Sequence, residues 1–570
     1  MRILRVIPVV LLLVSAARAQ QVRITVLDTT DLHGNMLPYD YYAARPAERG
    51  LAKIATLIQA ARAENPNTLL IDCGDTIQGT PLELVYQQFV QTGRLPLKLA
   101  FNGPSLEHDP MMLAMNALGY DAMVVGNHEF NFGLKNLSSA RADARFPWIS
   151  ANIQGEPGGT GKPFAPYLMK TVAGVKVGVV GITTPLIPEW EPDEHFRGLR
   201  FEPAVEAARR AVAELRAREH PDVVIVATHS GLDRDSPADQ TANGNSRENA
   251  VYEMATGVPG IDAILFGHTH QQLAGASIGD VLLLQPKNWG FSLGRMDFTL
   301  SREGQSGWKI LSKTSRAIPV TAAVAADPKV LEIARPYHDL AERYLNTIVA
   351  EAPVAMDTRL SRVEDTALID AIQEAQMFYA KADVSFASSF NVRVSVPQGP
   401  VAVRQLAALY LYDNELWAIQ GTGQMVREAL ENSARFFETC SGECSHGPLI
   451  NRRVVGYDFD MAQGVEYEID LTRPPGDRIR NLRWHGQPLS DTQPLRIAVN
   501  NHRAGGTAGY STYRGAKIVW RSPEEMRDLL IDYFSDHKLP AKPDDNWRVI
   551  PEGARKTLRA EALGDRDRSQ

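Results

Sequence analysis

Short apolar runs alternate with amphipathic stretches through the first half of the chain. The runs are rich in β-branched residues and nearly continuous in apolar positions, as in strands buried on both faces. They are Val22–Leu27, Thr68–Asp72, Ala122–Val125, Lys176–Ile182, Asp222–Ala227, Ile261–Phe266 and Val281–Leu284. Helical patterns lie between them, such as Leu51–Ala63, Pro110–Leu118 and Pro203–Arg218. Strands and helices in alternation predict an α/β layered domain.

The pattern changes near residue 320. Asp327-Pro328 reads as a helix N-cap followed by proline at the first helical position. Apolar residues then recur at helical spacing, at Val330, Ile333, Tyr337, Leu340, Tyr344 and Ile348, with Pro336 as a possible kink. We interpret residues 326–351 as a helix that connects a first domain, 20–325, to a second.

The second domain is expected to be of mixed α+β character and to span residues 352–551. Its predicted helices include Asp365–Lys381 and Thr422–Phe437. The remaining residues, 552–570, form a charged tail that is poor in apolar residues, and we expect it to be frayed.

Polar clusters follow most of the predicted strands of the first domain. They contain Asp31 and His33, Asp75, Asn127-His128-Glu129, His229, and His268 with His270; Thr183-Thr184 and Gln285-Pro286 are weaker examples. Ligands of α/β sheets bind beyond the carboxyl ends of the strands, so these side chains are expected to gather at one place.

The donor atoms of these clusters are the oxygens and nitrogens that divalent metals prefer. Each cluster alone has a structural explanation, such as helix capping by Gly-Asn-His-Glu, but the ordered set predicts two metal ions that share Asp75. One ion would be held by Asp31, His33, Asp75 and His270, and the other by Asp75, Asn127, His229 and His268. Mn, Co, Zn and Mg are all compatible, and the histidines favour the transition metals.

Composition narrows the class of partner. The chain has 570 residues, which exceeds what one core organises, and 44% of them are hydrophobic. Its formal net charge of −7 argues against a general attraction to nucleic-acid polymers or anionic membranes. Small anionic substrates remain compatible, because metals or arginines can supply local positive charge. No feature indicates an obligate protein partner.

The N-terminus reads as a secretory signal. Arg2 and Arg5 precede the apolar run Ile7–Val14, and Ala17-Arg18-Ala19 is a small-x-small cleavage site, so cutting is expected after Ala19. A membrane anchor is the alternative, but a span needs about 20 apolar residues. No cysteine lies near the cut, which argues against a lipoprotein. We expect a secreted protein of the bacterial periplasm, without a membrane anchor after cleavage.

The chain has three cysteines. Cys440 and Cys444 lie close together and could form a disulfide in an oxidising compartment, with a zinc site as the alternative. Cys73, at a predicted strand end, is interpreted as a small buried residue.

The ordered clusters resemble those of the calcineurin-like metallophosphoesterases, and most closely the secreted 5′-nucleotidase family. Within it, the chain resembles the periplasmic 2′,3′-cyclic-nucleotide 2′-phosphodiesterase/3′-nucleotidase branch. In the first domain the resemblance rests on Thr29–Met36 with Tyr41-Tyr42, Gly126–Asn131 and His229–Leu232. In the second it rests on Leu409–Asn414, Tyr457–Asp460 with Gly464-Val465, and Asn500–Ala504.

The resemblance implies a four-layer α/β/β/α catalytic domain followed by a 5′-nucleotidase-type substrate domain. It also implies in-line attack on phosphorus by water that two divalent metals activate, with His128 stabilising the transition state or protonating the leaving oxygen. An aspartate often orients this histidine in 5′-nucleotidases, and Asn131 stands in that place here. We interpret Asn131 as a marker of the cyclic-nucleotide branch, which would open a 2′,3′-cyclic nucleotide to a 3′-nucleotide and then release phosphate and nucleoside.

The same resemblance assigns nucleotide binding to the second domain. Two aromatic residues would sandwich the base, with Tyr412 as the first and His502, or in its place Tyr510, as the second. Asn391 and Arg393 are further candidate substrate contacts. Because the base and metal sites lie on different domains, rotation about the connecting helix is expected.

Two other functions compete with this reading. A 5′-nucleotidase or nucleotide-sugar hydrolase would use the same scaffold. A non-catalytic nucleotide-binding protein is a more remote alternative, since such a protein should have lost metal ligands or His128, and none is missing.

Overall fold

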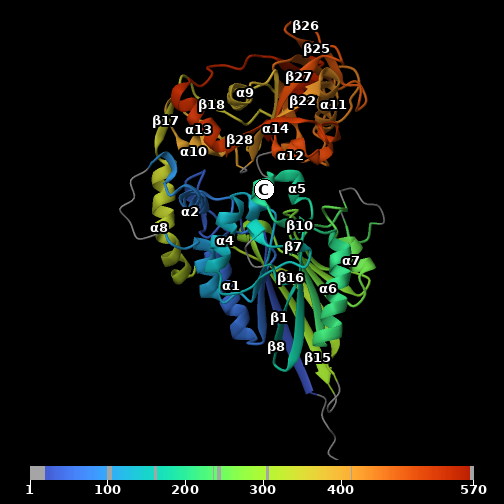
Figure 1. The fold of residues 1–570 in the computed structure, drawn as a ribbon. Helices are drawn as coiled ribbons and strands as arrows, with labels where there is room; N and C mark the ends of the chain where they lie inside the picture. The colour runs from blue at the N-terminus through green and yellow to red at the C-terminus, as the bar shows by residue number, and fades with distance from the viewer. Residues whose placement is uncertain are drawn as a thin grey trace, which may run out of the picture.

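The computed structural model describes residues 20–98, 106–159, 163–234, 236–239, 246–302, 307–411 and 414–564. The predicted signal segment, 1–19, and Tyr412 lie outside the described residues. Two domains are stacked end to end, with the N-terminal one below and the C-terminal one above in the view of Figure 1.

Two six-stranded sheets form the centre of the first domain. The first has the order β16 (Lys309–Pro319), β15 (Ser292–Arg302), β1 (Gln20–Thr29), β4 (Thr68–Asp72), β5 (Ala122–Val124) and β6 (Trp148–Ile149). The second has the order β13 (Leu273–Ile278), β14 (Val281–Gln285), β12 (Ala263–Phe266), β11 (Val223–His229), β9 (Val175–Thr183) and β8 (Tyr167–Val172). All seven predicted strands of this domain are therefore present, and each observed end lies within two residues of the predicted end.

Apolar side chains from both sheets make one buried layer, in which Val26 and Ile71 share a cluster with Val179 and Ile225. The outer face of the first sheet packs against α1 (Leu51–Glu64), α2 (Pro81–Thr92), α3 (Pro110–Leu118) and α4 (Gly133–Asp143). The outer face of the second packs against α6 (Ala204–Glu219) and α7 (Val251–Gly257). This is the predicted α/β/β/α order of layers, and it explains why the strands lack polar alternation.

Helix α8 (Pro328–Leu345) joins the two domains. The Asp327 carboxylate caps it by accepting hydrogen bonds from Lys329 N and Val330 N, at 2.9 and 3.0 Å. The Tyr41 hydroxyl lies 3.0 Å from His338 Nδ1 and so ties the helix to the first domain.

The predicted helix was too long at its C-terminal end. Ile348 lies in strand β17 (Ile348–Ala352), which pairs with β21 (Gly399–Ala402) of the second domain. Tertiary strand pairing outweighed the helical spacing of this residue.

The second domain is built on a five-stranded sheet. Its order is β23 (Asp460–Gln463), β19 (Val384–Ser388), β27 (Pro494–Asn500), β22 (Glu415–Thr422) and β28 (Ile518–Glu525). Its helices are α9 (Ala367–Ala380), α10 (Val403–Leu409), α11 (Gly423–Ser433) and α13 (Met526–Asp536). A four-stranded sheet adds β26 (Gln487–Pro488), β25 (Ile479–Trp484), β24 (Glu466–Asp470) and β29 (Trp547–Ile550).

Two local features of the second domain decide open questions from the sequence. Cys440 and Cys444 form a disulfide, with 5.4 Å between their Cα atoms, so the zinc alternative falls away. Residues expected to fray instead form α14 (Glu552–Gly564), because Ala554 and Leu558 are buried against the domain. Cys73 is buried and free, as predicted.

The remaining elements are short. They are α5 (Ile187–Trp190), α12 (Asn501–Ala504), β2 (Tyr39–Asp40), β3 (Arg45–Pro46), β7 (Ile153–Gly155), β10 (Leu199–Phe201), β18 (Met356–Asp357) and β20 (Ser395–Val396). Helices α5 and α12 meet where the two domains face each other (Figure 1). Among the helices of the described ranges, none has the length and apolar character of a membrane span.

Candidate metal centre and catalytic site

The predicted metal ligands gather at the carboxyl ends of the central strands of both sheets. Asp31 and His33 follow β1, Asp75 follows β4, and Asn127 follows β5. From the second sheet, His229 is the last residue of β11, and His268 and His270 follow β12. Six of these residues form two groups, Asp31 with His33 and His270, and Asp75 with His229 and His268. Within each group the candidate ligand atoms lie within 4.8 Å of one another.

The backbone at these positions is unusual. Five of the predicted ligands have left-handed φ values, namely Asp31 (50°), His33 (46°), Asp75 (58°), His268 (74°) and His270 (55°). Non-glycine residues pay about 1–3 kcal/mol each for such sparsely populated conformations, which cluster at functional sites. The turns after the strands are thus bent so that side chains from separate loops face a common point.

Asp75 lies between the two groups. Its Oδ2 is 2.9 Å from His229 Nε2 and 3.9 Å from His33 Nε2. His33 Nε2 is in turn 3.0 Å from His270 Nε2, which is 3.4 Å from Asp31 Oδ1. One carboxylate that reaches both groups is the arrangement expected of a shared ligand.

Outer contacts fix which nitrogen each histidine turns toward the centre. His33 Nδ1 donates to Gln78 Oε1 (2.9 Å), and His229 Nδ1 donates to the Cys73 carbonyl (2.7 Å). His268 Nε2 lies 2.9 Å from Glu248 Oε1, which leaves its Nδ1 for a metal. Partners of this kind hold metal-ligating imidazoles in one tautomer and orientation.

The donor set fits two divalent ions. Asn127 Oδ1 is buried and has no hydrogen-bond partner, which is costly unless a cation takes that place. Burial disfavours charge on His229, but the Asp75 carboxylate outweighs it and raises the pKa of His229 to about 10. Burial likewise opposes the charge on Asp75, yet His229 and then His128 hold the pKa of this carboxyl well below its usual range. Without metal, a proton on the histidine thus compensates the buried carboxylate.

Glu129 organises the loops around Asp75, a role that the sequence motif did not reveal. Its Oε2 accepts hydrogen bonds from Gly126 N (2.7 Å) and Asp75 N (2.9 Å), and its Oε1 accepts one from Thr76 N (2.6 Å). Gly126 must be glycine for lack of space, because a Cβ there would lie 2.3 Å from Asp75 Oδ1.

We therefore expect Gly126→Ala to displace Asp75 and reduce bound metal. The overpacking should cost about 1–3 kcal/mol of stability. Metal content and Tm check this against Gly257→Ala, where the added Cβ meets only Arg209 at 3.6 Å. Equal metal content in the two variants would contradict the role assigned to this close approach.

His128 stands at the edge of the centre at the start of a chain of hydrogen bonds. Its Nε2 is 3.9 Å from Asp75 Oδ2, and its Nδ1 is 2.6 Å from Asn131 Oδ1. Asn131 Nδ2 donates to Glu191 Oε1 (2.7 Å), so the amide is oriented with its oxygen toward the imidazole. His128 Nδ1 is therefore the donor, and Nε2 is the nitrogen that faces the centre.

The chain of hydrogen bonds continues to His195, beside a carboxylate of the second domain. Glu191 Oε2 accepts from His195 Nδ1 at 2.9 Å, and Glu191, His195 and Glu415 of β22 form a further group of candidate ligand atoms. These three residues and Asn131 line a cavity of 780 Å³ between the domains.

His502 lies at the same junction, on α12. Its ring stacks on Trp190 at 5.7 Å, and the other stacking partner of Trp190 is His268, at 5.9 Å. His502 is also 6.3 Å from the His128 ring. Asn501 Nδ2 donates to the Trp190 carbonyl at 2.8 Å. In this arrangement, the predicted base-stacking histidine already has an aromatic partner from the first domain.

The other candidate substrate-binding residues lie in positions that offer less to a nucleotide in this arrangement. Tyr510 is fully buried, and its hydroxyl donates to the Asp458 carbonyl at 2.9 Å, so its ring presents no face to a base in the observed arrangement. Asn391 uses Oδ1 to accept from Arg393 N and Nδ2 to donate to Ala408 O, which makes it a turn residue here. Arg393 is exposed on that turn. Nothing in the described residues bears on Tyr412.

Two sequence motifs of the second domain, Tyr457–Asp460 and Asn500–Ala504, are joined by hydrogen bonds. The buried Arg503 guanidinium bonds Asp460 Oδ2 at 2.8 Å and the Tyr457 carbonyl at 2.7 Å. Both motifs thereby support α12, the short helix that carries His502.

Comparison with known proteins agrees with this architecture. Residues 24–272 match the calcineurin-like phosphoesterase model, and residues 348–515 match the 5′-nucleotidase C-terminal domain model. A 2′,3′-cyclic-nucleotide 2′-phosphodiesterase/3′-nucleotidase of Salmonella typhimurium is 31% identical, over 95% of this chain and 91% of that protein. The chain belongs to the 5′-nucleotidase family of calcineurin-like phosphoesterases.

Two further similar proteins carry names of other nucleotide phosphoesterase activities. The trifunctional nucleotide phosphoesterase YfkN of Bacillus subtilis is 30% identical over 94% of this chain, which spans only 39% of that protein. A crystal structure of a Staphylococcus aureus protein assigned as a 5′-nucleotidase has a TM-score of 0.78 and 25% identity, covering 93% of this chain and all of that one. This phosphoesterase is accordingly a metal-dependent phosphoric ester hydrolase of the nucleotidase type.

Glu191 is a candidate functional residue of this nucleotidase that the sequence does not indicate. It carries no motif, and only the position of α5 brings it to Asn131, 60 residues earlier in the chain. Removing its carboxylate leaves the Asn131 amide free to turn its NH₂ group toward His128, which would remove the acceptor for Nδ1.

We therefore expect Glu191→Ala to lower kcat by about 10- to 100-fold with little change in KM, the range typical of partners that orient site residues. Glu191→Gln keeps an acceptor for Asn131 Nδ2 and should stay close to wild type. Glu189→Ala is the matched control, because it removes a nearby carboxylate, in α5 just before Glu191, that pairs with Arg247 instead. Steady-state kinetics distinguish the three variants; equal losses in the alanine and glutamine variants would contradict the orienting role.

Proposed function

We propose that this enzyme hydrolyses 2′,3′-cyclic nucleotides to 3′-nucleotides and then releases nucleoside and phosphate. The observation that carries the proposal is the His128–Asn131–Glu191 chain, in which an amide replaces the carboxylate of the 5′-nucleotidase pattern. The Salmonella relative bears the name of this activity and matches nearly end to end, which supports the same choice.

In the proposed site, Asp31, His33, Asp75, Asn127, His229, His268 and His270 hold two divalent metals. When bound, these ions activate water and neutralise charge on the phosphoryl oxygens. Mn, Co, Zn and Mg all suit the donors, and the imidazoles favour the transition metals.

His128 would act on the leaving oxygen. Because Nδ1 keeps its proton in the bond to Asn131, the proton that a charged imidazole can give away is the one on Nε2, on the side of Asp75. For the cyclic substrate the leaving oxygen is the ribose 2′ oxygen, and for the product it is the 3′ oxygen. These two oxygens are neighbours on one ring, so a single acid can serve both steps.

The second domain would hold the base. We assign stacking to Tyr412 and His502, with Asn391 and Arg393 as more distant candidates. Burial, and then the charges of His128 and Arg503, lower the pKa of His502 to about 3, so its ring is neutral and suited to stacking. Because His502 is stacked on Trp190 in this arrangement, base binding there requires the two domains to reorient.

A 5′-nucleotidase or nucleotide-sugar hydrolase is the second candidate, favoured by the likeness to the Staphylococcus aureus structure. The deciding experiment measures phosphate and nucleoside release from purified protein with Mn²⁺ or Co²⁺. The substrates are 2′,3′-cyclic AMP, 3′-AMP, 5′-AMP and UDP-glucose, compared side by side. We expect preference for the first two, with 3′-AMP appearing transiently from the cyclic substrate; preference for 5′-AMP or UDP-glucose would overturn the proposal.

We also propose secretion to the periplasm, because residues 1–19 read as a cleavable signal. Mass spectrometry of the protein recovered from a periplasmic fraction should give an N-terminus at Gln20. A retained Met1 would contradict it.

A further inference from the structure

Three aspartates of the second domain meet far from the metal centre. Asp365 precedes α9, Asp370 lies in the first turn of that helix, and Asp544 lies in the loop before β29. Their candidate ligand oxygens all lie within 4.8 Å of one another. Asp544 N also donates to Asp370 Oδ2 at 3.1 Å, which holds the loop against the helix.

Several oxygens at the start of α9 and in the loop before β29 are buried without a hydrogen-bond partner. They are Asp365 Oδ2, Thr366 Oγ1, Asp370 Oδ1 and Asn546 Oδ1. Asp370 is only 2% exposed, so water cannot replace the missing partners there. A buried acceptor left unsatisfied costs about 1–3 kcal/mol, and more if it is charged. The three carboxylate and amide oxygens among them only accept, so a donor or a cation is needed to satisfy them.

Among the described residues, no cationic side chain is a main influence on the half-buried Asp365 or the buried Asp370. Burial, followed by the carboxylates of Asp365 and Asp544, raises the pKa of Asp370 to about 9. Burial also raises the pKa of Asp365 to about 6. The charge of the cluster is therefore relieved either by a proton shared between Asp365 and Asp370 or by a bound cation.

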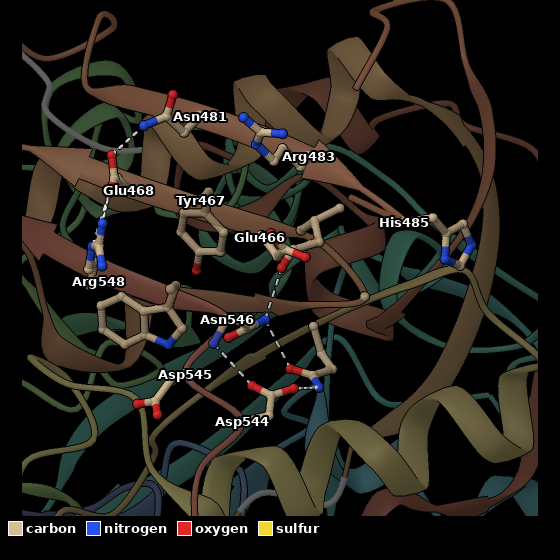
Figure 2. Close-up of a pocket in the computed structure, with 14 residues that line it drawn as sticks. Glu466, Tyr467, Glu468, Asn481, Arg483, His485, Asp544, Asp545, Asn546 and Arg548 are labelled. Atoms are coloured by element: carbon tan, nitrogen blue, oxygen red, sulfur yellow. Dashed lines mark hydrogen bonds and ion pairs between the residues drawn. The ribbon is translucent and has the colours of Figure 1, made fainter. Parts of the chain in front are cut away.

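The loop has a route to solvent. Asp544, Asp545 and Asn546 line a surface cavity of 620 Å³, and Figure 2 shows these three residues together along its lower edge. Asn546 Nδ2 donates to the carbonyls of Ala462 and Val465, at 2.8 and 3.0 Å, so its amide nitrogen is committed elsewhere. The exposed Asp544 therefore belongs both to the wall of this cavity and to the cluster.

We propose that Asp365, Asp370 and Asp544 form a calcium site that fastens the start of α9 to the loop before β29. Only oxygen donors are present, and Ca²⁺ takes oxygen ligands in flexible geometry, with water completing the shell. The ion joins the helix that packs on the five-stranded sheet to a strand of the four-stranded sheet. The site is independent of the proposed nucleotidase activity, and its affinity should be that of extracellular modules, with Kd about 10⁻⁴–10⁻³ M.

The test titrates Ca²⁺ into the metal-free full-length protein by calorimetry. Tm is then recorded without Ca²⁺ and with Ca²⁺ at roughly 5 to 10 times Kd, a concentration that nearly saturates a single site. Asp75→Asn removes the shared ligand of the catalytic centre and should keep this binding. Asp370→Asn should weaken it at least about ten-fold and lose the Ca²⁺-dependent rise in Tm. Asp544→Asn, at an exposed position, should do the same even if the buried substitution fails to fold.

Asp545→Asn is the matched control, because it neutralises the neighbouring exposed carboxylate outside the cluster, and it should bind like wild type. Two results overturn the proposal. One is Ca²⁺ binding that is unchanged in Asp370→Asn and Asp544→Asn or lost only in Asp75→Asn. The other is a Tm insensitive to Ca²⁺ in the wild type and raised in Asp370→Asn, as a shared proton predicts.

Discussion

Asp75→Asn will abolish activity and the retention of metal together. The substitution removes the one carboxylate of the described residues that reaches both ligand groups, and it leaves His229 and His33 facing an amide. We expect kcat to fall by more than about 10³-fold, beyond the effect of deleting one hydrogen-bond donor to a transition state. Metal content by mass spectrometry, measured on the same samples as kcat, should fall below that of the wild type at both sites.

Asp72→Asn is the matched control for this variant. Asp72 is also buried at the end of β4, but its oxygens accept from Gly74 N (2.9 Å), Thr76 Oγ1 (2.8 Å) and Thr29 Oγ1 (2.6 Å) and face no histidine among these contacts. An asparagine can keep the first two bonds with its oxygen and donate to Thr29 with its nitrogen. Metal content should therefore survive, and its loss in both variants would mean that any change at this strand end disrupts the site.

His128→Gln will lower kcat on nucleotides by about 10²- to 10⁴-fold, the usual contribution of a general acid, while both metals are retained. Unlike Asp75, His128 belongs to neither ligand group, and its Nε2 stands 3.9 Å from the Asp75 oxygen. The substitution therefore separates proton donation from metal binding.

The leaving group supplies the internal control. With 4-nitrophenyl phosphate, the departing phenolate needs no proton, so the loss should shrink by at least about ten-fold relative to 3′-AMP, following Brønsted behaviour. Equal losses on both substrates would contradict the acid role and leave His128 as a group that stabilises charge on phosphorus.

The parts of this site that the sequence predicts are those whose chemistry is local to a strand end. Asp31, Asp75 and His268 each follow an apolar run within a few residues, and parallel strands bring such positions to one edge of a sheet. The fold class follows for the same reason, since continuous apolar runs report burial on both faces.

What the sequence does not predict depends on contacts across long separations. Glu191 acquires its role only when α5 places it beside Asn131, and Asp544 meets Asp370 across 174 residues. The sequence offers Tyr510 as an alternative base-stacking residue, yet the ion pair of Arg503 with Asp460 packs against it in the core. Ile348 has helical spacing but joins a strand because β21 offers it a partner.

The fluorescence of the Trp190 indole should report on the orientation of the two domains. The indole is 3% exposed and lies between an imidazole of the metal centre and one from the second domain. Any movement that carries α12 away uncovers one face of the ring to water, and indole emission shifts to the red when water replaces a ring neighbour. The wild-type spectrum minus that of a Trp190→Phe variant would thus follow, in real time and without an attached dye, how often the enzyme opens during turnover.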